Sequence, residues 1–459
     1  MDTKDRRFLD RLASKNISRR DFIRYSSATL AVASVPKLTG CATYQPRQDC
    51  QDQLINGLDR YHENVFEESK IGSIRLNNRV IRSATTLGLG DPNGNPTKEL
   101  GDAYAELAMG GVGAIITGFS IVQKNGVPGM PNALLIVQDD QVRAYRKMSE
   151  AAHLHNTPII MQIGHAGRQT RRAITGEKPV APSPVPDKVY DEETPRALTD
   201  LEINDIIQNF IKAIERARDS GYDGVQLHVA HGYLLSAFLS SDTNRREDQW
   251  GGSLENRFRI VREIYEGARK RVGDYPILVK VNGYDFQSNG MRVEEMAQIA
   301  TMLENVGCDA IEVSSGIAND GFATSRVPEI PTEAILEFHF KYKDSPYIVK
   351  KLLPVFAPLL VDRPEPIYNY NVCAAETIKQ HVGIPVIVVG GIRNLHDIEQ
   401  IIGRNMADYV SMGRPFIIEP DIVSKFKEES QKSSECISCA FCLLALAEGP
   451  TRCFYGEIS

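Results

Sequence analysis

Eight short apolar runs, rich in β-branched residues, recur between residues 80 and 415. Their hydrophobicity is nearly continuous and does not alternate, which is typical of strands that are buried on both faces. We therefore interpret each run as a buried strand. The runs are Val80–Thr86, Ala114–Gly118, Pro158–Gly164, Gly224–Ala230, Ile277–Gly283, Ala310–Gly316, Pro385–Gly391 and Tyr409–Pro415.

Segments with the period of a helix lie between most of these runs. Leu201–Ser220 places five isoleucines and a phenylalanine on one face, and Thr199 or Asp200 can cap its start. Leu254–Val272 and Val293–Val306 have the same period. Strands and helices that alternate eight times predict an α/β fold, a (β/α)8 TIM barrel. The alternative, a doubly wound sheet, would call for Gly-x-Gly-x-x-Gly after the first strand, and that motif is missing there.

Two connections are much longer than the others, and both follow the carboxyl end of a predicted strand. Ala166–Ala197 is rich in proline and arginine, and Ile317–Asn371 is rich in proline and aromatic residues. Loops at that end of a barrel line the active-site mouth. These two segments are therefore either substrate caps or surface insertions.

The composition is that of an ordinary globular protein, with 42% hydrophobic and 24% charged residues among 459. No domain is basic, which argues against a nucleic-acid partner. Residues 1–40 nevertheless carry nine basic and four acidic residues, a net charge of +5. Because the whole chain is at −6, residues 41–459 carry −11. A basic head on an acidic body suggests a targeting segment.

The head contains two motifs in order. Ser18–Arg24 (SRRDFIR) resembles a twin-arginine (Tat) export signal, and the apolar run that follows is too short to span a bilayer. Leu38–Cys41 (LTGC) resembles a lipobox, in which Cys41 would be lipidated. These motifs predict export by the Tat pathway and a lipid anchor on the periplasmic side of the membrane. The alternative is a disordered basic tail with an incidental cysteine.

Three residues with reactive side chains lie at the end of the fourth predicted strand. His228, His231 and Tyr233 lie within six residues at its carboxyl end. Two imidazoles can donate hydrogen bonds to one oxygen, and a phenol with a pKa near 10 is a proton donor at neutral pH. We interpret them as an anion site with an acid beside it. The alternatives are a metal pair, for which no third ligand is nearby, and two core histidines.

Sequence motifs at the strand ends resemble those of the Old Yellow Enzyme family, the FMN-dependent ene-reductases and NADH:flavin oxidoreductases. The resemblance covers nearly all of residues 66–425. The motifs occur in family order: Asn78–Thr86, Gly110–Gly118, Gln162–Arg168, His228–Tyr233 with Gly251–Arg257, Val279–Val281, Gly390–Ile392 and Met412–Pro415.

The resemblance implies where FMN would bind. Loops after strands seven and eight form the phosphate site in many barrels, and glycines there let backbone N–H groups approach while an arginine adds charge. A cation near N1 and O2 favours the reduced flavin, and the resemblance places Lys280 there, Gln162 at the pyrimidine carbonyl and N–H, and Thr86 beside O4. The predicted cofactor residues are Ala84, Thr86, Gly118, Gln162, Lys280, Gly390, Gly391, Gly413 and Arg414. The alternatives are a salt bridge inside the barrel for Lys280, an ordinary β-branched strand residue for Thr86, and turn glycines with a surface arginine at the phosphate end.

The resemblance also implies a reaction. His228 and His231 would polarise an activated C=C bond through its carbonyl, nitro or phenolate oxygen. Hydride would come from flavin N5, and Tyr233 would protonate the opposite carbon. A second possibility is an amine dehydrogenase or demethylase with an Fe–S relay, as in some relatives. A third is a non-catalytic flavin electron-transfer lipoprotein.

The cysteines set the chain apart from simple relatives. Cys436, Cys439, Cys442 and Cys453 form a cluster, with two spacings one residue shorter than in relatives that hold a [4Fe–4S] centre. Four such thiols can bind [4Fe–4S] or zinc, form disulfides, or remain free. Three others, Cys50, Cys308 and Cys373, are scattered and are expected to be structural or free.

These features predict four parts of the chain. Residues 1–40 are a Tat-type signal with a lipobox, and residues 41–65 are a polar tether. Residues 66–425 are the FMN-binding barrel, and residues 426–459 are a cysteine-rich extension. Because the FAD/NAD domain of larger relatives does not follow, we expect an external electron donor, either NAD(P)H or a quinol- or cytochrome-linked protein. The expected substrate is a small alkene.

Overall fold

The structure is a computed structural model that describes Cys50 and residues 60–457, except residues 191–192, 288, 340–341 and 361–363. The predicted signal peptide and Cys41 lie outside the described residues. Most of the predicted tether lies outside them as well.

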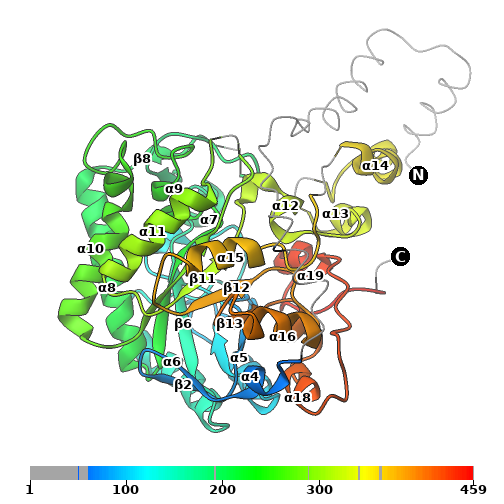
Figure 1. Cartoon of the computed structure of the whole chain (residues 1–459). Coiled ribbons are helices and arrows are strands. Elements are labelled where there is room, and N and C mark those ends of the chain that lie inside the picture. The colour runs from blue at the N-terminus through cyan, green and yellow to red at the C-terminus, as the bar shows by residue number, and fades with distance from the viewer. Residues whose placement is uncertain are drawn as a thin grey trace, which may run out of the picture.

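All eight predicted strands form, and they close into one parallel barrel (Figure 1). Closure joins β3 to β13 on one side and to β4 on the other, and β4 also pairs with β6. Each strand is shorter than its apolar run, because the last residues of most runs turn into loops at the mouth. The strands are β3 (Val80–Arg82), β4 (Ala114–Ile116), β6 (Ile159–Gly164), β9 (Gly224–Val229), β10 (Ile277–Asn282), β11 (Ile311–Ser314), β12 (Val386–Val389) and β13 (Tyr409–Met412). A short β5 (Ser120–Ile121) pairs with the end of β6.

Helices surround the barrel, as Figure 1 shows. The helix predicted near residue 200 begins at Asp200 with Thr199 as its cap, because the Thr199 side chain accepts from the Glu202 amide and the Glu202 carboxylate accepts from the Thr199 amide. Leu254–Val272 has the predicted bounds. The outer helices are α5 (Lys98–Met109), α6 (Val142–His153), α8 (Asp200–Asp219), α10 (Leu254–Val272), α11 (Val293–Asn305), α15 (Val372–Lys379), α16 (Leu395–Gly403) and α18 (Ile422–Lys427).

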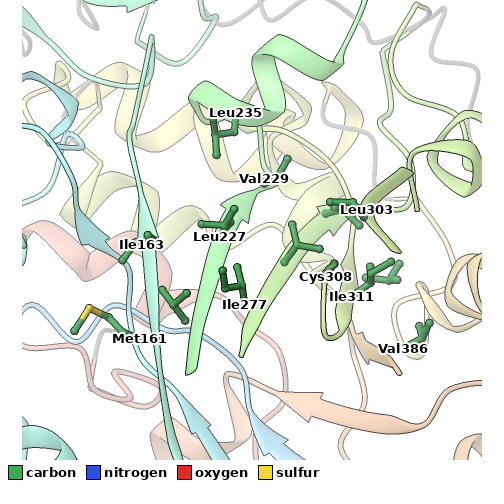
Figure 2. Packing of buried hydrophobic residues seen from close by; sticks show 14 of the residues in the cluster. Met161, Ile163, Leu227, Val229, Leu235, Ile277, Leu303, Cys308, Ile311 and Val386 are labelled. Atoms are coloured by element: carbon green, nitrogen blue, oxygen red, sulfur yellow. The ribbon is translucent and has the colours of Figure 1, made fainter. Parts of the chain in front are cut away.

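The largest apolar cluster fills the space between the strands and these helices. Figure 2 shows Leu227 and Val229 of β9 with Ile277 of β10 in this layer, and Cys308 lies among the same apolar side chains. Cys308 is a buried free thiol. A second cluster forms around the hairpin of β1 (Ser69–Ile71) and β2 (Ile74–Leu76), which follows α4 (His62–Phe66).

The two long connections fold differently. The first holds α7 (Arg172–Thr175) and the strand pair β7 (Val180–Ala181) and β8 (Arg196–Ala197). Outside these two connections, the short helix α9 (Leu234–Leu239) follows β9. The second holds α12 (Phe322–Ser325), α13 (Thr332–Phe338) and α14 (Tyr347–Leu360). Helix α17 (Pro415–Ile418) follows β13, and α19 (Phe441–Leu444) lies in the C-terminal extension.

The second connection and the C-terminal extension pack on each other. Helix α13 contacts α19, and the two lie to the right of the centre in Figure 1. Ile335 and Leu353 share a small apolar cluster with Ala440, and the ring centroids of Phe338 and Phe454 are 5.4 Å apart. This connection is therefore tied to the cysteine-rich extension, and the two form one layer beside the barrel.

One disulfide joins distant parts of the chain. Cys50 bonds Cys373, at the start of α15, and both side chains are buried. This pairing goes beyond the expectation that both cysteines are structural or free. Among the described residues, no helix combines the length and the apolar character needed to cross a membrane.

Candidate active site

The three predicted catalytic side chains meet at the mouth of the barrel. His228 lies near the end of β9, and His231 and Tyr233 follow in the turn before α9. The His228 ring centroid is 5.1 Å from that of His231 and 4.7 Å from that of Tyr233. Phe119 packs beside them, with its ring 5.0 Å from Tyr233. The prediction that these groups form one site is consistent with this geometry.

His231 is held in a backbone conformation that few non-glycine residues adopt, with φ of +62°. Its amide donates to Asn282 Oδ1 at 3.0 Å, and its carbonyl accepts from Gln169 Nε2 at 2.7 Å. Its Nε2 lies 2.8 Å from Ser314 Oγ. Side chains from β10 and the loop after β6 therefore hold the backbone of His231, and Ser314 of β11 holds its imidazole.

The ionisation states suit an acid beside two neutral donors. Burial lowers the pKa of His228 well below its usual value, and the nearby His231 and Lys280 lower it further. Burial, followed by Lys280, lowers the pKa of His231 to about 3. Burial raises the pKa of Tyr233. At neutral pH both imidazoles are uncharged and the phenol keeps its proton.

Lys280 points into the barrel, where a polar network surrounds it. Its Nζ donates to Ser83 Oγ at 2.9 Å and lies 3.2 Å from Glu312 Oε2. Gln162 Nε2 donates to Gln226 Oε1 at 2.7 Å, and Gln226 Nε2 donates to Glu312 Oε2 at 2.7 Å. Lys280 thus forms the salt bridge inside the barrel that was its alternative role, with Glu312 as partner. Lys280 and Gln162, the two residues predicted at the pyrimidine edge, belong to one hydrogen-bonded network.

Sequence reasoning missed the centre of this network. Glu312 is fully buried and also accepts from Ser83 and Ser411, each at 2.7 Å. Burial alone would raise the pKa of Glu312, but the Lys280 ammonium and the bonds from Ser411, Ser83 and Gln226 lower it below its usual value. A glutamate in the middle of an apolar strand was the available signal, because such a charge needs a partner.

The predicted residues after β3 and β4 lie against each other. A Cβ on Gly118 would come within 2.8 Å of Thr85 O, so glycine is required for the two loops to approach. Thr86 and Gly118 line one crevice with Phe119. Ala84 packs against the apolar cluster at the hairpin. A Cβ on Gly413 would lie 3.3 Å from Thr85 Oγ1, which places the end of β13 beside the same loop.

The predicted phosphate residues have close backbone neighbours. Gly390 and Gly391 have φ of +145° and +72°, and a Cβ on Gly391 would lie 2.6 Å from Ile367 O. These glycines therefore let the segment before α15 approach the end of β12. Arg414 Nη1 donates to Ser438 O at 3.2 Å, so the arginine reaches the C-terminal extension. A guanidinium has five donors, which leaves capacity for a phosphate.

The first long connection approaches the proton donor. Tyr190 is close enough to Tyr233 to add to the rise in the pKa of Tyr233, as is Asp187. Asp187 accepts from the Tyr190 amide at 3.2 Å, and its buried carboxylate lies 3.7 Å from Arg168 Nε. Arg168 Nη1 also donates to Val185 O at 3.3 Å. These contacts place the segment at the mouth, where a substrate cap would lie.

The four C-terminal cysteines gather in one place and form no disulfides. Burial raises the pKa of Cys442 to about 11; Arg414 lowers it, whereas Cys436, Cys439 and Cys453 raise it, so the four thiols are close. Within the described part of the chain, however, no three metal-ligating side chains are arranged to hold an ion. The extension also reaches the loop after β3, because Thr451 Oγ1 donates to Thr86 O at 2.8 Å.

The donors at the mouth fit an FMN group. A buried ammonium and an amide supply the pair that the pyrimidine edge needs, Lys280 and Gln162. Glycine turns and Arg414 lie at the ends of β12 and β13, where barrels bind phosphate. A parallel barrel with this set of residues defines a flavin-dependent oxidoreductase.

Comparison with known proteins gives the same class. A sequence model of the NADH:flavin oxidoreductase / NADH oxidase family matches residues 64–327 and 353–433. An NADH oxidase from Thermoanaerobacter brockii is 37% identical over 381 residues, which is 82% of this chain and 52% of that protein. The chain spans about half the length of the curated relatives that it matches first.

Two solved structures share the fold. A 2-naphthoyl-CoA reductase in complex with 2-naphthoyl-CoA has a TM-score of 0.73 at 25% identity, covering 86% of this chain and 57% of that one. An Old Yellow Enzyme homologue from Zymomonas mobilis has a TM-score of 0.64 at 24% identity, covering 82% of this chain and 96% of that one. The chain belongs to the NADH:flavin oxidoreductase / NADH oxidase family, which confirms the resemblance to Old Yellow Enzymes.

A buried carboxyl behind His231 predicts a pH effect on stability. Asp285 accepts from Asn282 Nδ2 at 2.7 Å, and burial, followed by Asp320, raises the pKa of Asp285 to about 7. The folded protein therefore binds this proton more tightly than the unfolded chain, and stability falls as pH rises from about 4 to 7. We expect Asp285→Asn to gain stability relative to wild type between pH 5 and pH 8, measured by urea unfolding at both values.

The exposed Asp140 supplies the control for this comparison. Asp140→Asn measures how much of any change in stability comes from the Asp-to-Asn substitution itself. A difference between Asp285→Asn and wild type that stays constant with pH would show that Asp285 ionises normally in the folded protein.

Proposed function

We propose that this protein reduces C=C bonds that a carbonyl or nitro group activates, with FMN as its redox cofactor. The observation that carries this proposal is the meeting of two neutral imidazoles and a protonated phenol at one point of the rim. Neutral donors can hold an oxygen that gains negative charge, and the phenol can supply the proton that completes the reduction.

Each residue has one role in this reaction. His228 Nδ1 accepts from the Ala230 amide at 3.4 Å, which places the ring proton on Nε2, as a donor to the substrate oxygen. His231 donates to the same oxygen, and Ser314 orients its ring. FMN, when bound, supplies the hydride to the β-carbon. Tyr233 then transfers its hydroxyl proton to the α-carbon, so that one hydride and one proton add across the double bond.

We further propose that the protein works outside the cytoplasm, anchored through lipid on Cys41. The Tat-like motif and the lipobox support this location. The Cys50–Cys373 disulfide supports it too, because structural disulfides persist mainly in oxidising compartments. NAD(P)H is scarce there, which favours a quinol- or cytochrome-linked electron donor over NAD(P)H.

We also propose that the four C-terminal cysteines hold a [4Fe–4S] centre that passes electrons to the flavin. Support comes from where the extension lies. Cys442 is close to Arg414 at the predicted phosphate end, and Thr451 bonds Thr86 at the opposite predicted edge of the flavin. A centre held by this extension would be next to the flavin and could receive electrons from an external donor.

The role of Tyr233 predicts a selective defect in Tyr233→Phe. Reduction of the flavin by dithionite should be unchanged, whereas reoxidation of the reduced protein by 2-cyclohexenone should slow by about 10²–10⁴-fold, the usual contribution of a general acid. Anaerobic stopped-flow absorbance of the flavin measures both steps.

Tyr190→Phe is the matched control, because it removes a second phenol close to Tyr233. If Tyr190→Phe loses enone turnover and Tyr233→Phe keeps it, the acid has been assigned to the wrong residue. Suppose that amines reduce the flavin of the wild-type protein and that enones do not reoxidise it. That result would contradict alkene reduction altogether.

If lipid on Cys41 anchors the protein, then replacing Cys41 should change the cell fraction in which the protein is found. In a bacterial host with a Tat pathway, the full chain should sediment with membranes, and Cys41→Ala should appear in the soluble periplasmic fraction. Cys308→Ala, which alters a buried thiol, should stay with the membranes. Retention of both variants in the cytoplasm would exclude export.

The cysteine centre predicts iron and acid-labile sulfide in anaerobically purified protein, about four of each per chain as a [4Fe–4S] group requires. Cys439→Ser should lower both, while the FMN content stays unchanged. Zinc at one equivalent, or disulfides among these cysteines in a mass spectrum of digested protein, would contradict the relay.

A further inference from the structure

Polar side chains inside the barrel converge on the carboxylate of Glu312. It is the second residue of β11, and its side chain is fully buried. Four donors from four other segments of the barrel surround it, each within 3.2 Å: Ser83 after β3, Gln226 on β9, Lys280 on β10 and Ser411 on β13.

The two residues predicted to serve the pyrimidine edge of the flavin are both connected to the Glu312 carboxylate. The Lys280 ammonium lies 3.2 Å from the Glu312 carboxylate. It also donates to Ser83 Oγ, which in turn donates to Glu312. Gln162 reaches it through Gln226, by two successive bonds of 2.7 Å. Register agrees with this arrangement, since Lys280 pairs with Glu312 and Gln162 pairs with Gln226 in adjacent strands.

The charge of Glu312 matters for a flavin beside Lys280. A reduced flavin carries negative charge near N1 and O2, so an isolated ammonium there would favour the reduced form strongly. A carboxylate 3.2 Å from that ammonium cancels much of its potential in a site with little water. The cancellation leaves the reduced cofactor a stronger hydride donor than it would be beside lysine alone.

We propose that Glu312 is a positioning residue that sets the reduction potential of bound FMN by neutralising Lys280 and orienting Gln162 through Gln226. This inference rests on FMN binding beside Lys280, as proposed above, and is independent of the roles of His228, His231 and Tyr233. A residue that only stabilised the barrel would alter unfolding and leave the flavin potential unchanged.

The test is spectroelectrochemical titration of the FMN-loaded protein. Glu312→Gln keeps the shape and removes the charge, so reduction should become at least tenfold more favourable, about 30 mV for a two-electron couple. Ser411→Ala removes one hydrogen bond and keeps the charge, and should shift the potential less. Glu399→Gln is the matched control, because Glu399 is a buried glutamate paired with Arg60 and His62, away from the barrel interior.

A double-variant cycle shows whether the effect acts through Lys280. Lys280→Met removes the cation and should lower the potential. Adding Glu312→Gln to it should raise the potential less than in the wild type, because burial favours the protonated form of Glu312 once Lys280 is gone. If Glu312→Gln alone does not fold, the shift in Ser411→Ala against an unshifted Glu399→Gln still tests the proposal. An unchanged potential in Glu312→Gln, or a rise as large in the Lys280→Met background as in the wild type, would overturn it.

The potential is measured without an alkene, so this experiment is separate from the test of the proposed reaction. Loss of enone turnover in the wild type would leave the prediction for Glu312 standing. An unchanged potential in Glu312→Gln would leave the alkene reduction standing.

Discussion

A lysine buried inside a closed barrel is the constraint on which the rest of this structure depends. An ammonium taken out of water is costly unless it is paired and hydrogen-bonded. Glu312 and Ser83 supply that pairing for Lys280, and they come from β11 and from the end of β3. Only closure of the sheet brings those segments to one point, so the barrel and its polar interior require each other.

The same closure places the chemistry at one rim. His228 and His231 are kept neutral by burial and by Lys280, while burial also keeps the proton on Tyr233. One buried cation thus lowers the pKa of both imidazoles and stands at the predicted edge of the cofactor. The C-terminal extension adds to this rim, since Thr451 bonds Thr86 and Ser438 bonds Arg414.

Local signals in the sequence were enough to predict the barrel. Apolar runs such as Ile277–Gly283 located the strands, and the helical period of Leu254–Val272 gave that helix its observed bounds. Their closeness in the sequence located His228, His231 and Tyr233, because neighbouring residues at one strand end stay together in any barrel. The signal motifs before Cys50 remain predictions.

Features that depend on register between distant strands were not predictable. Glu312 meets Ser411 and Ser83 across segments far apart in the chain, and nothing local in AIEVS shows those partners. The Cys50–Cys373 bond joins residues 323 apart, and pairing among scattered cysteines does not follow from spacing. The contact of Thr451 with Thr86 likewise depends on how the extension folds back over the barrel.

The most direct measurement is the fate of hydrogen in a single turnover. Protein with chemically reduced FMN would be mixed anaerobically with 2-cyclohexenone in D₂O, and the product would be analysed by NMR. Alkene reduction at this site predicts cyclohexanone with deuterium at the α-carbon, delivered through the exchangeable proton of Tyr233, and at the β-carbon, because the N5–H of reduced FMN also exchanges with D₂O. Reduced flavin that stays reduced, with the enone recovered unchanged, would contradict it.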